Sequence, residues 1–137
     1  MALAAQVCFI APAEGTIMSK VLLVEDDPLV RATMTDALED ASYEVIAVED
    51  ASQAMQHLAY FPIDVLLADI RMPGTLSGID LSHIVSSRWP DVIIFLISGR
   101  SETEMGELPP GAEFFQKPFS LDHLTGRLQA RLAEKAQ

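Results

Sequence analysis

The sequence predicts an α/β fold in which helices cover both faces of a parallel sheet. From Lys20 onward, short apolar runs alternate with stretches whose apolar residues recur at helical spacing. The most hydrophobic run, VIIFLI at 92–97, has no polar residue on either face, which suits a central strand of a parallel sheet. With 137 residues, half of them hydrophobic, the chain can form one compact core. We therefore expect a single folded domain.

The elements follow one another in a regular order. The expected strands are 21–24, 43–48, 63–68, 92–97 and 112–115. Helices are expected over 30–41, after an N-cap at Asp50, up to Trp89-Pro90, and from a Ser120 N-cap nearly to Gln137. Parallel strands need right-handed crossovers, which place helices on both faces. The expected architecture is a flavodoxin-like, doubly wound five-stranded sheet of order 2-1-3-4-5.

The segment between the fourth and fifth strands breaks this regularity. Its start, Ser101 to Glu104, could support about one helical turn, but the pair Pro109-Pro110 cannot continue a helix. We therefore expect the helix at this place, the fourth in the usual order, to be short or remodelled.

The N-terminal residues 1–18 lie outside the predicted domain, which spans 19–137. They contain no Lys or Arg, and the apolar run Val7–Ala11 ends at Pro12, so it is too short to cross a membrane and lacks the features of a signal peptide. The single cysteine, Cys8, cannot form an internal disulfide. We expect a disordered N-terminal extension and a cytoplasmic protein.

The charge balance is strongly acidic. Twenty Asp and Glu residues against nine Lys and Arg residues give a net charge of −11. Such a charge repels nucleic-acid backbones and anionic membrane surfaces. Partners of either kind are therefore not expected.

Polar residues gather where the predicted strands end. The acids Glu25, Asp26 and Asp27 follow the first strand, and Asp69 follows the third. Ser98 and Lys117 follow the fourth and fifth strands. Because ligands of open parallel sheets bind at the carboxyl ends of the strands, these groups should be considered together.

Clustered carboxylates repel one another unless a cation neutralises them, and hard oxygen ligands without Cys or His favour Mg²⁺ over Zn²⁺. If the metal holds a phosphoryl group, Lys117 and the Ser98 hydroxyl can hold its remaining oxygens while Asp69 attacks in line. The product would be an aspartyl phosphate.

Four segments resemble the signatures of bacterial response-regulator receiver domains, namely VLLVEDDPLVR, LLADIRMPG, LISG and FFQKPF. The resemblance covers residues 20 to about 135 and implies a chemotaxis-receiver-like fold, with an LPPGA-x-F-x-QKPF ending similar to receivers of hybrid histidine kinases. It implies that Asp69 is the phosphoacceptor and that Lys117 precedes a cis proline. It also implies a Mg²⁺ site made by Glu25, Asp26, Asp69 and the backbone carbonyl of Arg71.

The resemblance further assigns a switch. Ser98 matches the conserved Ser/Thr, and Phe114 matches the aromatic position that turns inward when the Ser98 hydroxyl moves toward the phosphoryl group. Core packing of Phe114 is the alternative. Arg71 and Arg100 occupy positions beside the phosphoryl group, where they could change its lifetime or remain solvated.

The resemblance implies a stand-alone receiver that takes a phosphoryl group from a histidine kinase or histidine phosphotransfer protein onto Asp69 and signals to an unknown output protein. It would catalyse only its own phosphorylation and dephosphorylation, as a monomer or weak homodimer. The alternative is a pseudo-receiver, an interaction module that is never phosphorylated.

Two other classes fit the residues less well. A haloacid-dehalogenase-like phosphatase needs an Asp where Arg71 stands, and a flavin-binding module needs a phosphate loop where Glu25–Asp27 stand. His57, His83 and His123 are expected to be surface residues.

Overall fold

The computed structural model describes residues 18–99 and 106–136. The expected extension at 1–18 therefore lies outside the described residues, apart from Met18. Along the chain the elements are β1 (Lys20–Val24), α1 (Pro28–Asp40), β2 (Glu44–Val48), α2 (Ala51–Tyr60), β3 (Val65–Asp69), α3 (Gly78–Arg88), β4 (Ile93–Ser98), β5 (Glu113–Gln116) and α4 (Leu121–Lys135).

The five strands form one parallel sheet of order β2-β1-β3-β4-β5, which confirms the predicted topology. The three inner strands β1, β3 and β4 are buried almost throughout, as their unbroken apolar runs predict. The bounds of the expected strands differ by one residue at most, except at the start of β3. Ile63 is buried as expected, but the strand begins only at Val65, after Asp64 has accepted a hydrogen bond from the backbone of Lys20.

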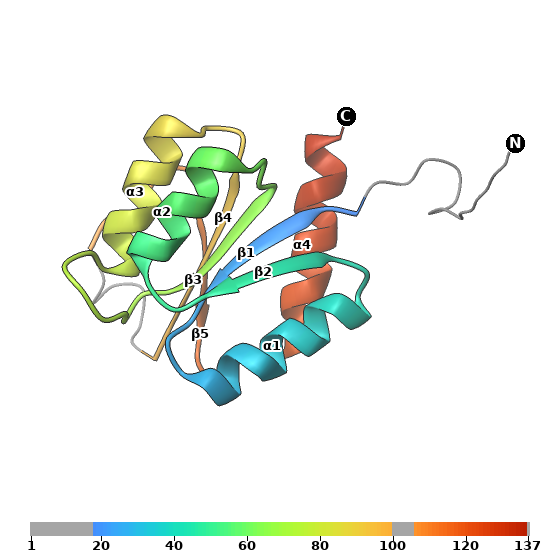
Figure 1. Cartoon of the computed structure of the whole chain (residues 1–137). Coiled ribbons are helices and arrows are strands. Elements are labelled where there is room, and N and C mark those ends of the chain that lie inside the picture. Colours follow the sequence, from blue (N-terminus) through green and yellow to red (C-terminus); the bar gives the residue numbers. More distant parts are fainter. Residues whose placement is uncertain (1–17, 100–105, 137) are drawn as a thin grey trace, which may run out of the picture.

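Two helical layers sandwich the sheet (Figure 1). Helices α2 and α3 cover one face, over a core that includes Leu22, Leu66 and Leu96. Helices α1 and α4 cover the other face, over Leu23, Leu67 and Phe95. Alternate residues of each inner strand thus enter opposite cores, which explains why these strands are apolar at every position.

Each helix begins at a polar side chain that accepts hydrogen bonds from the first helical N–H groups. The N-caps are Asp27, Asp50, Ser77 and Ser120, of which Asp50 and Ser120 were predicted. Ser77 forms a reciprocal capping box with Asp80. Because the first three helices follow a strand closely, their N-termini lie near the carboxyl ends of the strands.

The connection from β4 to β5 contains no helix over its described part, Gly99 and residues 106–112. Leu108 and Ala112 pack against the core under α2 and α3, and a His83 ring nitrogen lies 2.9 Å from the Glu107 carbonyl oxygen. The expected short or remodelled helix is thus a loop where it is described. Residues 100–105, on which the expected helical turn falls, lie outside the described residues.

Helix α4 is attached to the edge strand β5 by ion pairs. The Arg127 guanidinium donates two hydrogen bonds to the Glu113 carboxylate at 2.9 and 2.7 Å, and Arg131 donates a third at 2.8 Å. These hydrogen bonds from Arg127 and Arg131 lower the pKa of Glu113 against the opposing effect of its partial burial. None of the described helices has the length and apolar character needed to cross a membrane.

Helix α1 ends in a Schellman motif that places a non-glycine residue in the left-handed region. The N–H of Tyr43 donates to the Leu38 carbonyl at 3.0 Å, and that of Ser42 donates to Glu39 at 2.9 Å. Ser42 has φ of 73°. Glycine is the preferred residue here because it has no Cβ to clash.

Replacing Ser42 with glycine should therefore stabilise the protein. We expect Ser42→Gly to raise the free energy of unfolding by about 0.5–1 kcal/mol, measured by urea denaturation. As a matched control, Ser87→Gly in the last turns of α3 should lower it by a similar amount, about 0.5–1 kcal/mol, because that residue is helical. A loss of stability in Ser42→Gly would contradict the strain argument.

Candidate functional site

The carboxyl ends of four strands bring the predicted polar residues to one edge of the sheet. Glu25 and Asp26 follow β1, Asp69 ends β3, Ser98 ends β4, and Lys117 follows β5. The register places Ser98 beside Gln116, and the Lys117 N–H donates to the Ser98 carbonyl at 2.8 Å. The Lys117–Pro118 peptide bond is cis, as the resemblance implies.

The central contact of the site is an ion pair between Lys117 and Asp69. Lys117 Nζ lies 2.7 Å from Asp69 Oδ2, and the Asp69 residue is only 6% exposed. Partial burial by itself would lower the pKa of Lys117. The hydrogen bond to Asp69 and the charges of Asp69, Glu25 and Asp26 outweigh that effect and raise it, so the side chain is an ammonium ion.

The second oxygen of Asp69 is held by the backbone. Asp69 Oδ1 accepts a hydrogen bond of 3.0 Å from the Arg71 N–H. The Arg71 side chain itself is exposed. Asp69 is therefore fixed on both sides while its carboxylate still borders the cavity at this edge.

Glu25 is buried beside Asp69. It is 3% exposed, and its Oε2 accepts a hydrogen bond of 3.1 Å from the Asp27 N–H. Burial raises the pKa of Glu25 to about 7, the Asp27 N–H opposes this shift, and the negative charge of Asp69 adds to it. Without a cation, the Glu25 carboxyl group is therefore partly protonated near neutral pH.

The other two acids of the cluster have different surroundings. Asp26 is exposed, and the Arg31 side chain donates to the carbonyls of Glu25 and Asp26 at 2.8 and 3.4 Å. Asp27 uses its carboxylate to cap α1 through the N–H groups of Leu29 and Val30. Asp27, which is not among the implied ligands of Mg²⁺, thus has a structural role as an N-cap.

A cavity of about 570 Å³ lies at this edge and brings together Glu25, Asp26, Asp69, Arg71 and Lys117. The two expected switch residues do not line it. Ser98 is fully buried, and Phe114 is partly buried against the core under α2 and α3. Arg100 lies outside the described residues.

Comparison with known proteins agrees with this geometry. Residues 21–129 match the family described as the response regulator receiver domain. The chain belongs to this family.

Relatives of this receiver are found among curated proteins. It is 32% identical over 118 residues to the response regulator receiver protein CpdR of Brucella abortus (strain 2308). The aligned segment covers 84% of this chain and 98% of CpdR. Seven other curated relatives are longer, and the aligned part spans 22–52% of their lengths.

Solved structures share the fold. A CheY-like receiver domain protein from Methanospirillum hungatei JF-1 has a TM-score of 0.81 at 22% identity, covering 88% of this chain and 98% of that one. The response regulator TrrA from Thermotoga maritima, in complex with Mg²⁺–BeF, has a TM-score of 0.75 at 25% identity over 82% of this chain and 98% of TrrA. The family match makes the chain a signalling domain, and the solved structures show that its fold is CheY-like and flavodoxin-like.

The donor set of the site fits Mg²⁺. The buried carboxylates of Glu25 and Asp69 lie side by side. Among the residues that line the cavity, the cationic ones are Lys117 and the exposed Arg71. In the described part of the chain, no three His, Cys, Asp or Glu side chains form a metal site by themselves. Mg²⁺ commonly binds through one or two carboxylates and keeps water and phosphate oxygens as its other ligands.

Gly78 is a positioning residue that the sequence analysis missed. It is the first residue of α3, and its N–H donates to the Ile70 carbonyl at 2.9 Å. A Cβ at this position would lie 2.5 Å from the Asp69 carbonyl oxygen and 2.7 Å from Ile70 Cα. The absence of a side chain therefore lets α3 pack against the backbone that carries Asp69. Only its place after Ser77, a residue type common at N-caps, is visible in the sequence, and this does not reveal the close approach.

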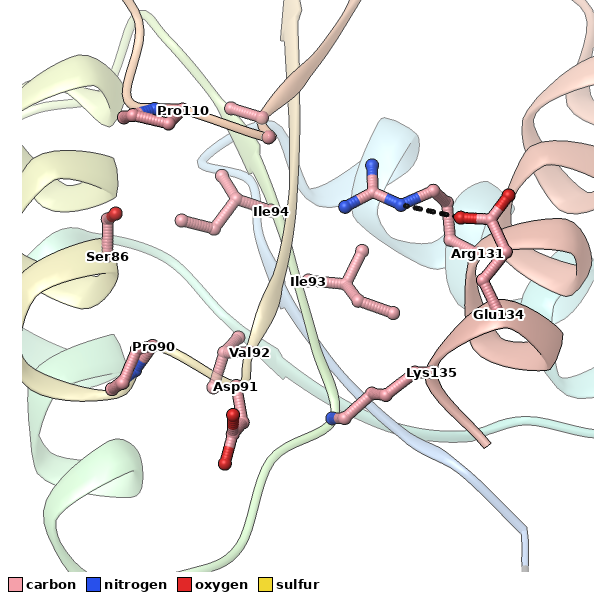
Figure 2. Close-up of a pocket in the computed structure, with 12 residues that line it drawn as sticks. Ser86, Pro90, Asp91, Val92, Ile93, Ile94, Pro110, Arg131, Glu134 and Lys135 are labelled. Atoms are coloured by element: carbon pink, nitrogen blue, oxygen red, sulfur yellow. Dashed lines mark ion pairs between the residues drawn. The ribbon is translucent and has the colours of Figure 1, made fainter. Parts of the chain in front are cut away.

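A second cavity, of about 420 Å³, lies at the opposite ends of the strands (Figure 2). It is bordered by Ile93 and Ile94 of β4, by Pro110, and by Arg131 of α4. Its Arg131 and Lys135 are already paired, with Glu113 and Glu134 and with Asp64. None of the predicted site residues borders it.

The buried Glu25 should make stability fall with rising pH. Its pKa is raised from 4.5 to about 7 in the folded chain, so its contribution is fully present below about pH 4.5 and is lost as pH rises through 7. In chelator-treated protein, Glu25→Gln should become more stable than wild type by about 2 kcal/mol above pH 8 but not at pH 4.5. Urea denaturation at both pH values measures this.

The matched control is Glu39→Gln, which changes an exposed glutamate on α1. Its difference from wild type should be the same at both pH values. If the stability of Glu25→Gln depends on pH as strongly as that of wild type, Glu25 does not cause the dependence.

Adding a methyl group at Gly78 should disturb the backbone that carries Asp69. We expect Gly78→Ala to lower the free energy of unfolding by about 1–3 kcal/mol, because the new Cβ overlaps backbone atoms that cannot rotate away. Gly126→Ala is the control. It lies inside α4 with no atom within 4 Å of its Cβ position, and should instead stabilise the protein by about 0.5–1 kcal/mol. Equal effects of the two substitutions would contradict the close-approach argument.

Proposed function

We propose that this receiver accepts a phosphoryl group from a phosphohistidine donor onto Asp69 in a Mg²⁺-dependent reaction. The observation that carries the proposal is the contact of 2.7 Å between Lys117 and Asp69 at the mouth of a cavity bordered by Glu25 and Asp26. The donor would be a histidine kinase or a histidine phosphotransfer protein. Membership of the receiver family supports this choice.

The transfer is a single displacement at phosphorus. A carboxylate oxygen of Asp69 forms the new O–P bond as the N–P bond to the donor imidazole breaks, and the imidazole leaves with the bonding electron pair and takes up a proton. The reaction consumes no oxidant and releases a neutral histidine. Hydrolysis of the acyl phosphate by water restores Asp69 and releases inorganic phosphate.

The residues around Asp69 serve this reaction by position and charge. The Arg71 N–H and the Lys117 ammonium hold the Asp69 carboxylate in one orientation. Lys117 can then stabilise the charge that moves onto the phosphoryl oxygens. We propose that the hydroxyl group of Ser98, at the end of the neighbouring strand, donates a hydrogen bond to one of these oxygens.

We propose that Glu25, Asp26, Asp69 and the Arg71 carbonyl hold the metal. When bound, Mg²⁺ supplies positive charge that neutralises the carboxylates and the phosphoryl oxygens. The complex of TrrA with Mg²⁺–BeF supports this assignment. Glu25 must give up its proton to act as a ligand, which links metal binding to pH.

Signalling would use Ser98 and Phe114. We propose that the Ser98 hydroxyl moves toward the phosphoryl group and that the partly buried Phe114 turns into the space it leaves. We propose that the receiver over 19–137 acts in the cytoplasm and, by analogy with CpdR, which is matched over 98% of its length, signals to a separate output protein. The acidic net charge argues against nucleic acid as the direct target.

Phosphorylation is tested by intact-mass analysis after incubation with acetyl phosphate and Mg²⁺. Wild type should gain the mass of one phosphoryl group, and chelation of Mg²⁺ or the change Asp69→Asn should abolish the gain. Asp91→Asn, an exposed aspartate at the other end of the sheet, should be phosphorylated like wild type. A wild-type protein without an adduct, from acetyl phosphate and from a panel of phosphorylated histidine proteins, would instead indicate a pseudo-receiver.

A further inference from the structure

The Arg31 side chain, in the first turn of α1, binds backbone carbonyl groups rather than an acid. Its Nη1 atom donates a hydrogen bond of 2.8 Å to the Glu25 carbonyl oxygen and a longer one of 3.4 Å to that of Asp26. No ion pair among the described residues includes Arg31, although the chain carries twenty acids. The helix dipole opposes a cation so close to a helix N-terminus. The two carbonyl groups therefore hold the guanidinium in place against this effect.

The helix backbone does not supply these hydrogen bonds, because the N–H groups at the start of α1 donate to Asp27. Those of Leu29 and Val30 donate to its carboxylate, and that of Arg31 donates to its carbonyl oxygen at 2.9 Å. The carbonyl groups that the Arg31 side chain binds lie before this point, where β1 turns directly into α1 (Figure 1). Helical side chains point toward the N-terminus, so a long side chain at position 31 reaches back over this turn.

Both residues held by Arg31 are acids of the candidate metal site. The Glu25 N–H donates to the Val48 carbonyl at 3.0 Å, so β2 holds the backbone of Glu25 at its N–H while Arg31 holds it at its carbonyl. Because a peptide group is planar, its orientation affects the direction in which the neighbouring side chains leave the backbone. Glu25 and Asp26 line the cavity beside Asp69, whereas Arg31 does not. Arg31 can therefore affect the geometry of the site through the backbone of the two acids.

We propose that Arg31 is a positioning residue for the Mg²⁺ site, which holds the backbone of Glu25 and Asp26 so that their carboxylates stay directed into the cavity. The inference rests on the proposed Mg²⁺ site. Groups that orient metal ligands raise the affinity of a site, because the ligands then lose less freedom on binding. The Asp26 side chain is exposed, so its direction depends on its backbone more than on packing.

The charge of Arg31 and its hydrogen bonds have opposite effects on Mg²⁺ binding. The positive charge repels a second cation near the site, so removal of the charge would by itself strengthen binding. Loss of the hydrogen bonds would free the turn and weaken binding. The direction of the change in affinity therefore distinguishes positioning from a purely electrostatic effect.

Isothermal titration calorimetry of Mg²⁺ into the full, unphosphorylated chain tests the proposal. Arg31→Met nearly keeps the length of the side chain but removes its charge and its donors, and should raise the Mg²⁺ dissociation constant about tenfold. Arg31→Lys keeps the charge and should give an intermediate value, because its shorter side chain reaches the carbonyl groups less well. The matched control is Arg88→Met, which removes the same charge from an exposed residue at the C-terminal end of α3 and should leave the dissociation constant unchanged.

Phosphorylation by acetyl phosphate gives a second readout. The Mg²⁺ concentration at half-maximal rate should rise in Arg31→Met by the same factor, while the rate at saturating Mg²⁺ stays close to that of wild type. A damaged fold would instead lower the rate at every Mg²⁺ concentration. Thermal unfolding in the presence of a chelator shows whether the variants are folded.

Unchanged or tighter Mg²⁺ binding in Arg31→Met would overturn the inference but not the metal site, since wild type would still bind. Equal weakening in Arg88→Met would also overturn it. A wild type that binds no Mg²⁺ would overturn both the site and the inference. If Arg31→Met does not fold, Arg31→Lys decides. Weaker binding in that variant supports positioning, and binding like that of wild type overturns it, because the charge is unchanged.

Discussion

The ion pair between Lys117 and Asp69 holds together a site that would otherwise repel itself. Two carboxylates, those of Glu25 and Asp69, are more than nine-tenths buried at neighbouring strand ends. Burial of charge is unfavourable unless it is paired or neutralised. Asp69 is paired with the ammonium of Lys117 and the Arg71 N–H, whereas Glu25 takes up a proton near neutral pH. The free-energy cost of burying a negative charge is thus offset by pairing at Asp69 and by protonation at Glu25. A bound cation would reduce this cost for both carboxylates.

The rest of the fold keeps that ion pair in register. Lys117 follows β5, a short edge strand that gains its position from β4 on one side and from the Arg127 and Arg131 contacts of α4. Asp69 ends β3, whose backbone is contacted by Gly78 of α3. The Lys117 N–H also bonds the Ser98 carbonyl across the strand ends. A small movement of α3 or α4 would therefore change the distance between the two charged groups.

Sequence reasoning succeeds here where a rule acts locally. Unbroken apolar runs identified the inner strands, and polar residues directly after them indicated the site, because parallel strands end at one edge. The sequence did not allow contacts between distant elements to be predicted. Gly78 could not be singled out, since its value depends on how closely α3 approaches β3. The start of β3 was placed two residues early because buried Ile63 continues the apolar pattern without pairing in the strand.

Charge is distributed unevenly over the molecule, and this affects how a donor can find the site. The net charge of −11 repels acidic partners at long range, so for the proposed transfer electrostatic attraction over distance cannot guide an acidic donor to Asp69. Recognition must then depend on short-range contacts or on a donor with a basic docking surface. Around the cavity the cationic side chains of Lys117 and Arg71 act locally, and Lys117 is already engaged with Asp69. A bound metal would thus make phosphoryl transfer possible at an edge that is otherwise too negative to accept it.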